Sequence, residues 1–91
     1  MKKRAHIIVH GRVQGVFFRH HTTEKARELK VTGWVKNLSD GTVEIICEGE
    51  KNDIDEMILW CGKGPRGAFV EKTDVSWEEY AGEFATFDTR Y

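Results

Sequence analysis

The sequence predicts an α+β fold in which two helices cover one face of an antiparallel sheet. Three observations support this prediction: apolar alternation near the N-terminus, a hairpin pattern at the centre of the chain, and two amphipathic helical segments that each follow a strand. The elements are expected in the order β-α-β-β-α-β. Each helix then connects two strands and packs back onto the sheet.

The first strand is expected at residues 5–10 and the first helix at about residues 18–29. Ile7 and Val9 share one face of the strand, as the period of two requires, and Ile8 lies on the other face. In the helix, four residues fall on one face at steps of four, four and three: Phe18, Thr22, Ala26 and Leu29. The charged residues between them are expected to face solvent.

A β-hairpin is expected next, with strands at residues 33–38 and 42–48. Asp40 and Gly41 lie between these strands, and both residue types tolerate the positive φ of a tight turn. A second helix is expected at residues 53–61, with Asn52 as its N-cap. Its buried stripe has the spacing i, i+3, i+4, i+7 and consists of Ile54, Met57, Ile58 and Cys61. Three residues are expected to end this helix: Gly62, Gly64 and Pro65.

The last third of the chain is expected to form one long strand and a short closing strand, with a turn at Gly82 between them. Together these elements follow the ferredoxin-like plan, the split βαβ arrangement. This plan hosts many unrelated functions, so the function must be inferred from a site.

Composition limits the possible classes of protein. The 91 residues are enough for one domain, expected to span residues 1–91, and 40% of them are apolar and 32% charged, as in folded proteins. The net charge of −1 argues against a nucleic-acid binder, which usually carries a basic excess, and favours a small-molecule ligand. No apolar run approaches the ~18–20 residues of a membrane span, and no signal-peptide core follows the basic start. The expected compartment is therefore the cytoplasm, and the expected state is a monomer.

The strongest chemical pattern lies at residues 11–19, Gly-Arg-Val-Gln-Gly-Val-Phe-Phe-Arg. The stretch joins a strand to a helix start, where backbone N–H groups have no intrahelical acceptor. Gly11 and Gly15 let the chain curl so that successive N–H groups point into one concavity that suits an anion. Arg19, in the first helical turn, can bring its guanidinium to the same anion and bind two of its oxygens.

On spacing alone, the same residues also fit a plain tight connection followed by a solvent-exposed arginine. A cation at a helix N-terminus is unfavourable with the dipole by roughly 0.3–1 kcal/mol. Arg19 therefore fits better where an anion lies between its side chain and the helix. Within the loop, Gln14 is expected to stabilise the backbone and Arg12 to be solvated.

Two segments resemble conserved motifs of the acylphosphatase family. The first is Gly11-Arg12-Val13-Gln14-Gly15-Val16-Phe17-Phe18-Arg19, and the second is Gly33-Trp34-Val35-Lys36-Asn37 followed by Asp40-Gly41-Thr42-Val43-Glu44. The resemblance covers nearly the whole chain, and the family has the ferredoxin-like fold. Many members have Gly at the position of Phe17, where Phe is also a familiar variant.

The resemblance implies an enzyme that hydrolyses the carboxyl–phosphate anhydride of acyl phosphates to a carboxylate and inorganic phosphate. The family's phosphate-binding arginine corresponds to Arg19, and its water-orienting asparagine corresponds to Asn37. The implied phosphate-binding residues are Gly11, Arg12, Val13, Gln14, Gly15, Val16, Phe17, Phe18 and Arg19, with the N–H groups of loop 11–17 holding the phosphate. Phosphate and sulfate are expected to inhibit, and neither a cofactor nor a metal is expected.

Other candidate sites and functions are weaker. Four histidines are present, but adjacent helical residues such as His20 and His21 cannot face one ion, and no zinc-binding spacing exists. Cys47 and Cys61 are not a CxxC pair, no disulfide between them is expected, and they are interpreted as two partly buried thiols. An RNA-binding module of the RRM type would need base-stacking aromatics on the third strand, which has none. A non-catalytic sensor of small molecules with the same fold would need neither Arg19 nor Asn37.

Overall fold

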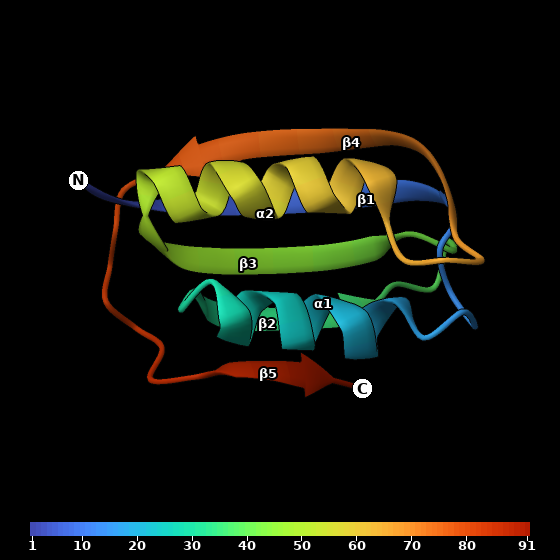
Figure 1. Ribbon diagram of the computed structural model, residues 1–91, viewed down its shortest axis with the longest axis horizontal. Coiled ribbons are helices and arrows are strands. Elements are labelled where there is room, and N and C mark those ends of the chain that lie inside the picture. Colours follow the sequence, from blue (N-terminus) through green and yellow to red (C-terminus); the bar gives the residue numbers. More distant parts are fainter.

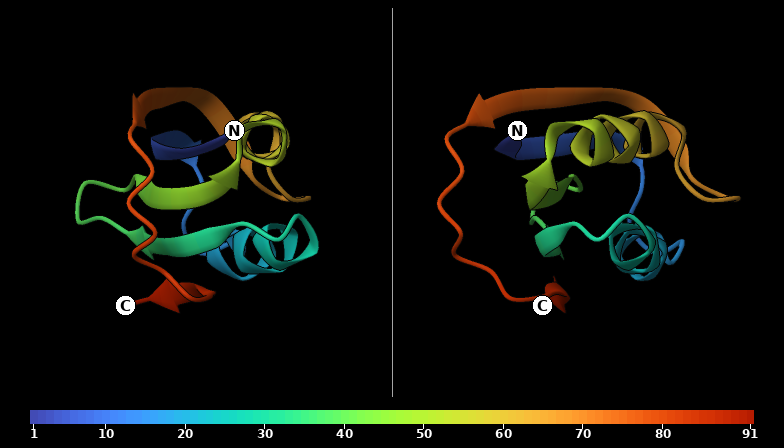
Figure 2. Two further views of the ribbon diagram at one scale, coloured as in Figure 1. Left: turned by 90° about the vertical axis from the view of Figure 1, so that its left-hand side faces the viewer. Right: turned by 60° about the vertical axis from the view of Figure 1, so that its left-hand side comes forward.

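The computed structural model describes residues 1–91, which form five strands and two helices. In chain order the elements are β1 (Lys2–Arg12), α1 (Phe18–Glu28), β2 (Thr32–Asn37), β3 (Val43–Glu50), α2 (Lys51–Lys63), β4 (Phe69–Glu78) and β5 (Phe87–Arg90). Both helices lie on one face of a single sheet, as Figures 1 and 2 show. No helix is both long enough and apolar enough to cross a membrane.

The sheet has the strand order β4-β1-β3-β2-β5. Strands β1 to β4 pair antiparallel, as the sequence predicts, so the ferredoxin-like fold class is confirmed. The short β5 pairs parallel with β2, with Gly33 opposite Phe87, and the complete sheet is therefore mixed. This parallel pairing arises because the chain returns along the end of the sheet before β5 begins (Figure 1).

The hydrophobic core lies between the two helices and the sheet. Alternate residues of β1, namely Ala5, Ile7 and Val9, are completely buried, in agreement with the predicted period of two. The predicted helical faces also contribute, because Phe18 and Ala26 of α1 and Ile54 and Met57 of α2 are buried at 1% exposure or less. The core therefore fixes the position of α1, whose first turn borders the cavity described below.

The start of α2 differs from the sequence-based expectation. The helix begins at Lys51, directly after β3, so Asn52 lies inside the first turn and is not the N-cap. The N-cap position belongs to Glu50, and no side chain caps the helix there. Gly62 lies in the last turn of the helix, and Gly64, with a φ of 73°, is the residue that ends it.

A buried carboxylate holds the segment that connects β4 to β5. The Glu48 side chain is fully buried and accepts hydrogen bonds from the backbone N–H groups of Ala81, Gly82 and Glu83, at 2.8, 3.2 and 3.1 Å. These three bonds satisfy a charge that would otherwise be costly to bury. They fix the path of the segment, and this path brings β5 and the chain end back to β2.

Candidate active site

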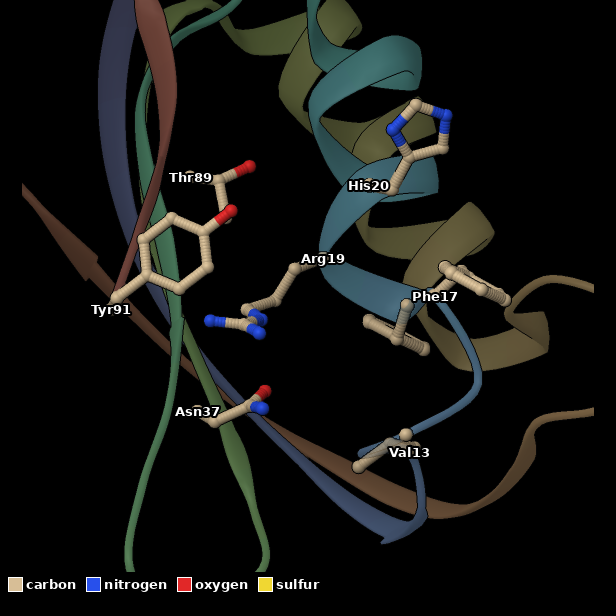
Figure 3. A pocket seen from close by; sticks show the side chains of 9 residues that line it. Val13, Phe17, Arg19, His20, Asn37, Thr89 and Tyr91 are labelled. Carbon is tan, nitrogen blue, oxygen red and sulfur yellow. The ribbon is translucent and has the colours of Figure 1, made fainter.

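A cavity of about 370 Å³ lies where the loop after β1, the start of α1 and the ends of β2 and β5 meet. Three stretches far apart in the sequence, residues 13–20, residue 37 and residues 89–91, thus form one site. Figure 3 shows the Arg19 side chain extending from α1 between Val13 and Phe17 on one side and Asn37 and Tyr91 on the other. The lining residues are Val13, Gly15, Phe17, Phe18, Arg19, His20, Asn37, Thr89 and Tyr91.

The N-terminus of α1 leaves its backbone donors free. The first helical hydrogen bond runs from the N–H of His21 to the carbonyl of Phe17, at 3.0 Å. None of the backbone N–H groups from Val13 to His20 donates a hydrogen bond within the chain, and no side chain caps the helix. The first turn also contains no acidic residue. This end of the helix can therefore bind an anion through its free N–H groups and its positive dipole.

The loop before α1 is curled by two residues in the left-handed region. Gly15 has a φ of 75°, which glycine adopts at little cost, and Phe17 has a φ of 60° although it carries a large side chain. The Gln14 side chain braces the loop by donating hydrogen bonds to the carbonyls of Leu38 and Thr42, at 2.7 and 2.8 Å. The loop is thereby tied to the β2–β3 turn, directly after Asn37.

The turn itself is fixed by local hydrogen bonds. Both the N–H and the hydroxyl of Thr42 donate to the Asp40 carboxylate, at 3.0 and 2.6 Å. These hydrogen bonds hold the pKa of Asp40 below its ordinary value. The bond from the Thr42 hydroxyl has the larger effect, and the bond from the Thr42 N–H adds to it. An ordered turn keeps the end of β2, and therefore Asn37, in a constant position relative to the loop.

Arg19 is oriented by the end of the chain. Its Nη1 donates a hydrogen bond to the Arg90 carbonyl at 3.0 Å, and its guanidinium lies over the Tyr91 ring at 4.6 Å from the centroid. No carboxylate lies within ion-pair distance of Arg19. These contacts hold the plane of the guanidinium, while its charge stays available for an anionic ligand.

Asn37 is the last residue of β2, and its backbone pairs with Val43 of β3. Its side-chain Oδ1 is buried and has no hydrogen-bond partner. A buried polar atom without a partner is rare and costs about 1–3 kcal/mol. The amide faces the same cavity as Arg19 (Figure 3), where a bound water or ligand would supply the missing hydrogen bond.

The cavity contains some of the predicted site residues and not others. Val13, Gly15, Phe17, Phe18, Arg19 and Asn37 line it, whereas Gly11, Arg12, Gln14 and Val16 do not. The need for glycine at position 11 comes from strand packing and not from the cavity. A Cβ on Gly11 would lie 2.1 Å from the Phe69 carbonyl oxygen of β4. Arg12 is exposed at the end of β1, and Val16 packs against the core.

Sequence reasoning did not assign three lining residues to the site: His20, Thr89 and Tyr91. Thr89 and Tyr91 reach the cavity only because β5 pairs with β2, and no local pattern in the sequence predicts that pairing. The sequence presents His20 only as a possible metal ligand. Its position in the first turn of α1, next to Arg19, is the feature that places it at the cavity.

Other reactive groups lie outside the cavity. Cys47 and Cys61 are free and buried, and burial raises the pKa of the Cys47 thiol to about 12 and that of Cys61 further. Buried thiols of this kind are poor nucleophiles. No group of three or more His, Cys, Asp or Glu side chains is close enough together to hold a metal ion.

Comparison with known proteins gives a consistent result. The family model described as Acylphosphatase matches residues 5–89. The acylphosphatase of Geobacter sulfurreducens is 48% identical over 91 residues, covering 100% of both chains, and that of Pelotomaculum thermopropionicum is 45% identical over 94% of both. The crystal structure of acylphosphatase from Bacillus subtilis superposes with a TM-score of 0.94 and 35% identity, covering 100% of both chains.

Proposed function

The chain belongs to the acylphosphatase family of hydrolases, and we propose that it hydrolyses acyl phosphates in the cavity between α1 and β2. In this reaction a water oxygen bonds to phosphorus, and the bond from phosphorus to the acyl oxygen breaks. The products are a carboxylate and inorganic phosphate. The substrate is a small molecule, and inorganic phosphate, as the product, competes with it for the same site.

The phosphoryl group binds at the N-terminus of α1. Its oxygens accept hydrogen bonds from the free N–H groups between Val13 and His20 and from the guanidinium of Arg19. Phosphoryl transfer spreads negative charge over the non-bridging oxygens, so fixed donors around them stabilise the transition state. The leaving carboxylate has a pKa of roughly 4 and needs no general acid.

Asn37 orients the attacking water. A neutral amide cannot act as a base at neutral pH, but its Oδ1 can accept a hydrogen bond from a water and hold it in line with the scissile bond. One observation supports this role above the others: Oδ1 is buried and unpartnered in the same cavity as Arg19. The assigned division is therefore phosphate binding by Arg19 and the loop, and water positioning by Asn37.

A phosphate-release assay on benzoyl phosphate tests the proposed function. The purified protein is expected to release phosphate at a rate far above spontaneous hydrolysis, and added inorganic phosphate is expected to inhibit competitively. Arg12→Gln is the matched control for Arg19→Gln, because Arg12 ends β1 directly before the loop but its exposed side chain lies outside the cavity lining. No release above the spontaneous rate, or equal losses in the two variants, would contradict the proposal.

A further inference from the structure

Phe17 combines two features that do not stabilise the protein. Its backbone is left-handed, with φ 60° and ψ 26°, a conformation that is unfavourable for a bulky L-residue. Phe17 is also 76% exposed, whereas the adjacent Phe18 is 1% exposed and belongs to the core. Packing of the Phe17 ring therefore does not compensate for the backbone strain. Strained residues of this kind concentrate at functional sites.

The position of Phe17 relative to the cavity indicates a use for its ring. Figure 3 shows Phe17 at the side of the cavity opposite Asn37 and Tyr91. One face of the Tyr91 ring already contacts the guanidinium of Arg19, 4.6 Å from the ring centroid, although the residue is otherwise exposed. Phe17 is therefore the aromatic residue of the lining whose ring is both exposed and free of a stacked partner.

An acyl phosphate has two chemically different ends. The phosphoryl end requires the N–H groups and the Arg19 charge at the start of α1. The acyl end carries no charge and needs apolar contact, which the lining offers mainly through the exposed rings of Phe17 and Tyr91, because Val13 and Phe18 are buried. A flat aromatic ring contributes most binding free energy when it stacks on another ring. Such pairs are more favourable than their buried apolar area alone would predict.

We propose that the Phe17 ring binds the acyl group of the substrate and gives the enzyme a preference for aromatic acyl phosphates over acetyl phosphate. This inference rests on the proposed function and assigns a specificity-determining residue to it. The left-handed backbone at Phe17 places the ring at the cavity rim instead of in the core.

The test measures kcat/KM for benzoyl phosphate and acetyl phosphate in the wild type, Phe17→Gly, Phe17→Ala and Phe17→Tyr. The ratio of the two values is the readout, because a disturbed loop backbone affects both substrates alike and cancels. Loss of one stacked aromatic pair is expected to lower the ratio about five- to tenfold in the Gly and Ala variants, mainly through KM. The Tyr variant retains a ring and should keep the wild-type ratio.

Two further measurements distinguish the effect of losing the Phe17 ring from the effect of backbone strain and from unspecific binding to any exposed phenyl ring. Phe17→Gly relieves the positive φ and should raise Tm by several degrees, whereas Phe17→Ala retains it and should not, although both lower the ratio. Phe69→Ala removes another exposed phenyl ring, 65% exposed and outside the lining, and should leave the ratio unchanged.

The outcomes distinguish this inference from the proposed function. A ratio that stays within twofold of the wild type in both Phe17→Gly and Phe17→Ala overturns the inference, as does an equal decrease in Phe69→Ala, and in both cases the function stands. Hydrolysis of neither substrate by the wild type overturns the proposed function, and the inference falls with it.

Discussion

Helices α1 and α2 both begin without a side-chain cap, but they treat the positive end of the helix dipole in opposite ways. In α2 the first N–H, that of Lys51, donates to the Met1 carbonyl at 3.0 Å, and Asp53 supplies an acidic residue in the first turn. In α1 the corresponding N–H groups have no acceptor, the first turn lacks an acidic residue, and Arg19 adds a positive charge there.

The two helices differ in the source of the negative group that stabilises the positive end of the dipole. The chain itself supplies part of what stabilises the start of α2, namely one backbone acceptor and the Asp53 carboxylate. The start of α1 is left unsatisfied beside a cavity, so the favourable partner must come from outside. Helix α1 is therefore expected to be less stable without a ligand than with a phosphoryl group bound at its N-terminus.

Removing the cation from the α1 terminus is expected to give the largest effect. Arg19→Gln should lower kcat/KM on the order of 10³-fold or more, because one arginine at a transferring phosphoryl group contributes that much or more. Phosphate inhibition should weaken as well. The Tm should change little, since the lost contacts to Arg90 and Tyr91 are offset by removal of a cation from the helix N-terminus.

Steady-state kinetics and thermal unfolding of the same preparation measure both quantities. A folded Arg19→Gln variant with wild-type activity on benzoyl phosphate would show that the cation at α1 is not part of the site.

Changing Asn37 should separate the chemical step from phosphate binding. Asn37→Ala is expected to lower kcat and kcat/KM by similar factors, on the order of 10²-fold, while the phosphate inhibition constant stays near its wild-type value. The Tm should not fall, because the substitution removes a buried oxygen that has no partner.

Asn52→Ala is the matched control at the other helix, where the side chain is exposed and lies in the first turn of α2. It should leave kcat unchanged. If Asn37→Ala instead weakens phosphate inhibition strongly and barely alters kcat, Asn37 is a phosphate ligand and the assigned division of roles is wrong.

Phosphate should stabilise the folded protein through α1. At a free phosphate concentration ten times Kd, the expected gain in the free energy of unfolding is about 1.4 kcal/mol, which raises Tm by several degrees in a domain of this size. Sulfate should act similarly, and a chelator should alter neither Tm nor activity. An equal rise in Tm for Arg19→Gln would place the anion elsewhere.

The smallest expected effect lies at α2. Asp53→Asn removes the negative charge that this terminus already has and should cost about 0.3–1 kcal/mol of stability. Kinetic constants and phosphate inhibition should stay at wild-type values. Phosphate should stabilise this variant no more than the wild type, and an extra stabilisation would mean that α2 also binds the anion.

The sequence predicted the fold well because the core-forming patterns are local. The alternation in β1 and the stripes in both helices depend only on neighbouring residues, and the buried positions Ile7, Phe18 and Ile54 agree with them. The start of α2 was misplaced because β3 continues into the helix without a loop, which no capping pattern indicates. The parallel pairing of β5 depends on the route of a distant segment held by Glu48, and four residues carry too little pattern to predict it.

The site was predictable to the extent that it lies in continuous motifs. Arg19 and Asn37 were chosen from two separate segments, and the fold brings both to one cavity; their catalytic roles stay predictions. Thr89 and Tyr91 were missed because their proximity follows from the tertiary pairing of β5. Gly11 belongs to a motif, but its position is explained by the close approach of β4.

Titration of the backbone amides with inorganic phosphate, followed by two-dimensional NMR, tests the central comparison most directly. Saturable shift changes are expected in the amides from Val13 to His20, whose N–H groups are free, with little change in the first turn of α2 from Lys51 to Ile54. Equal changes at both helix starts, or none at the start of α1, would show that the N-terminus of α1 is not the specific phosphate site.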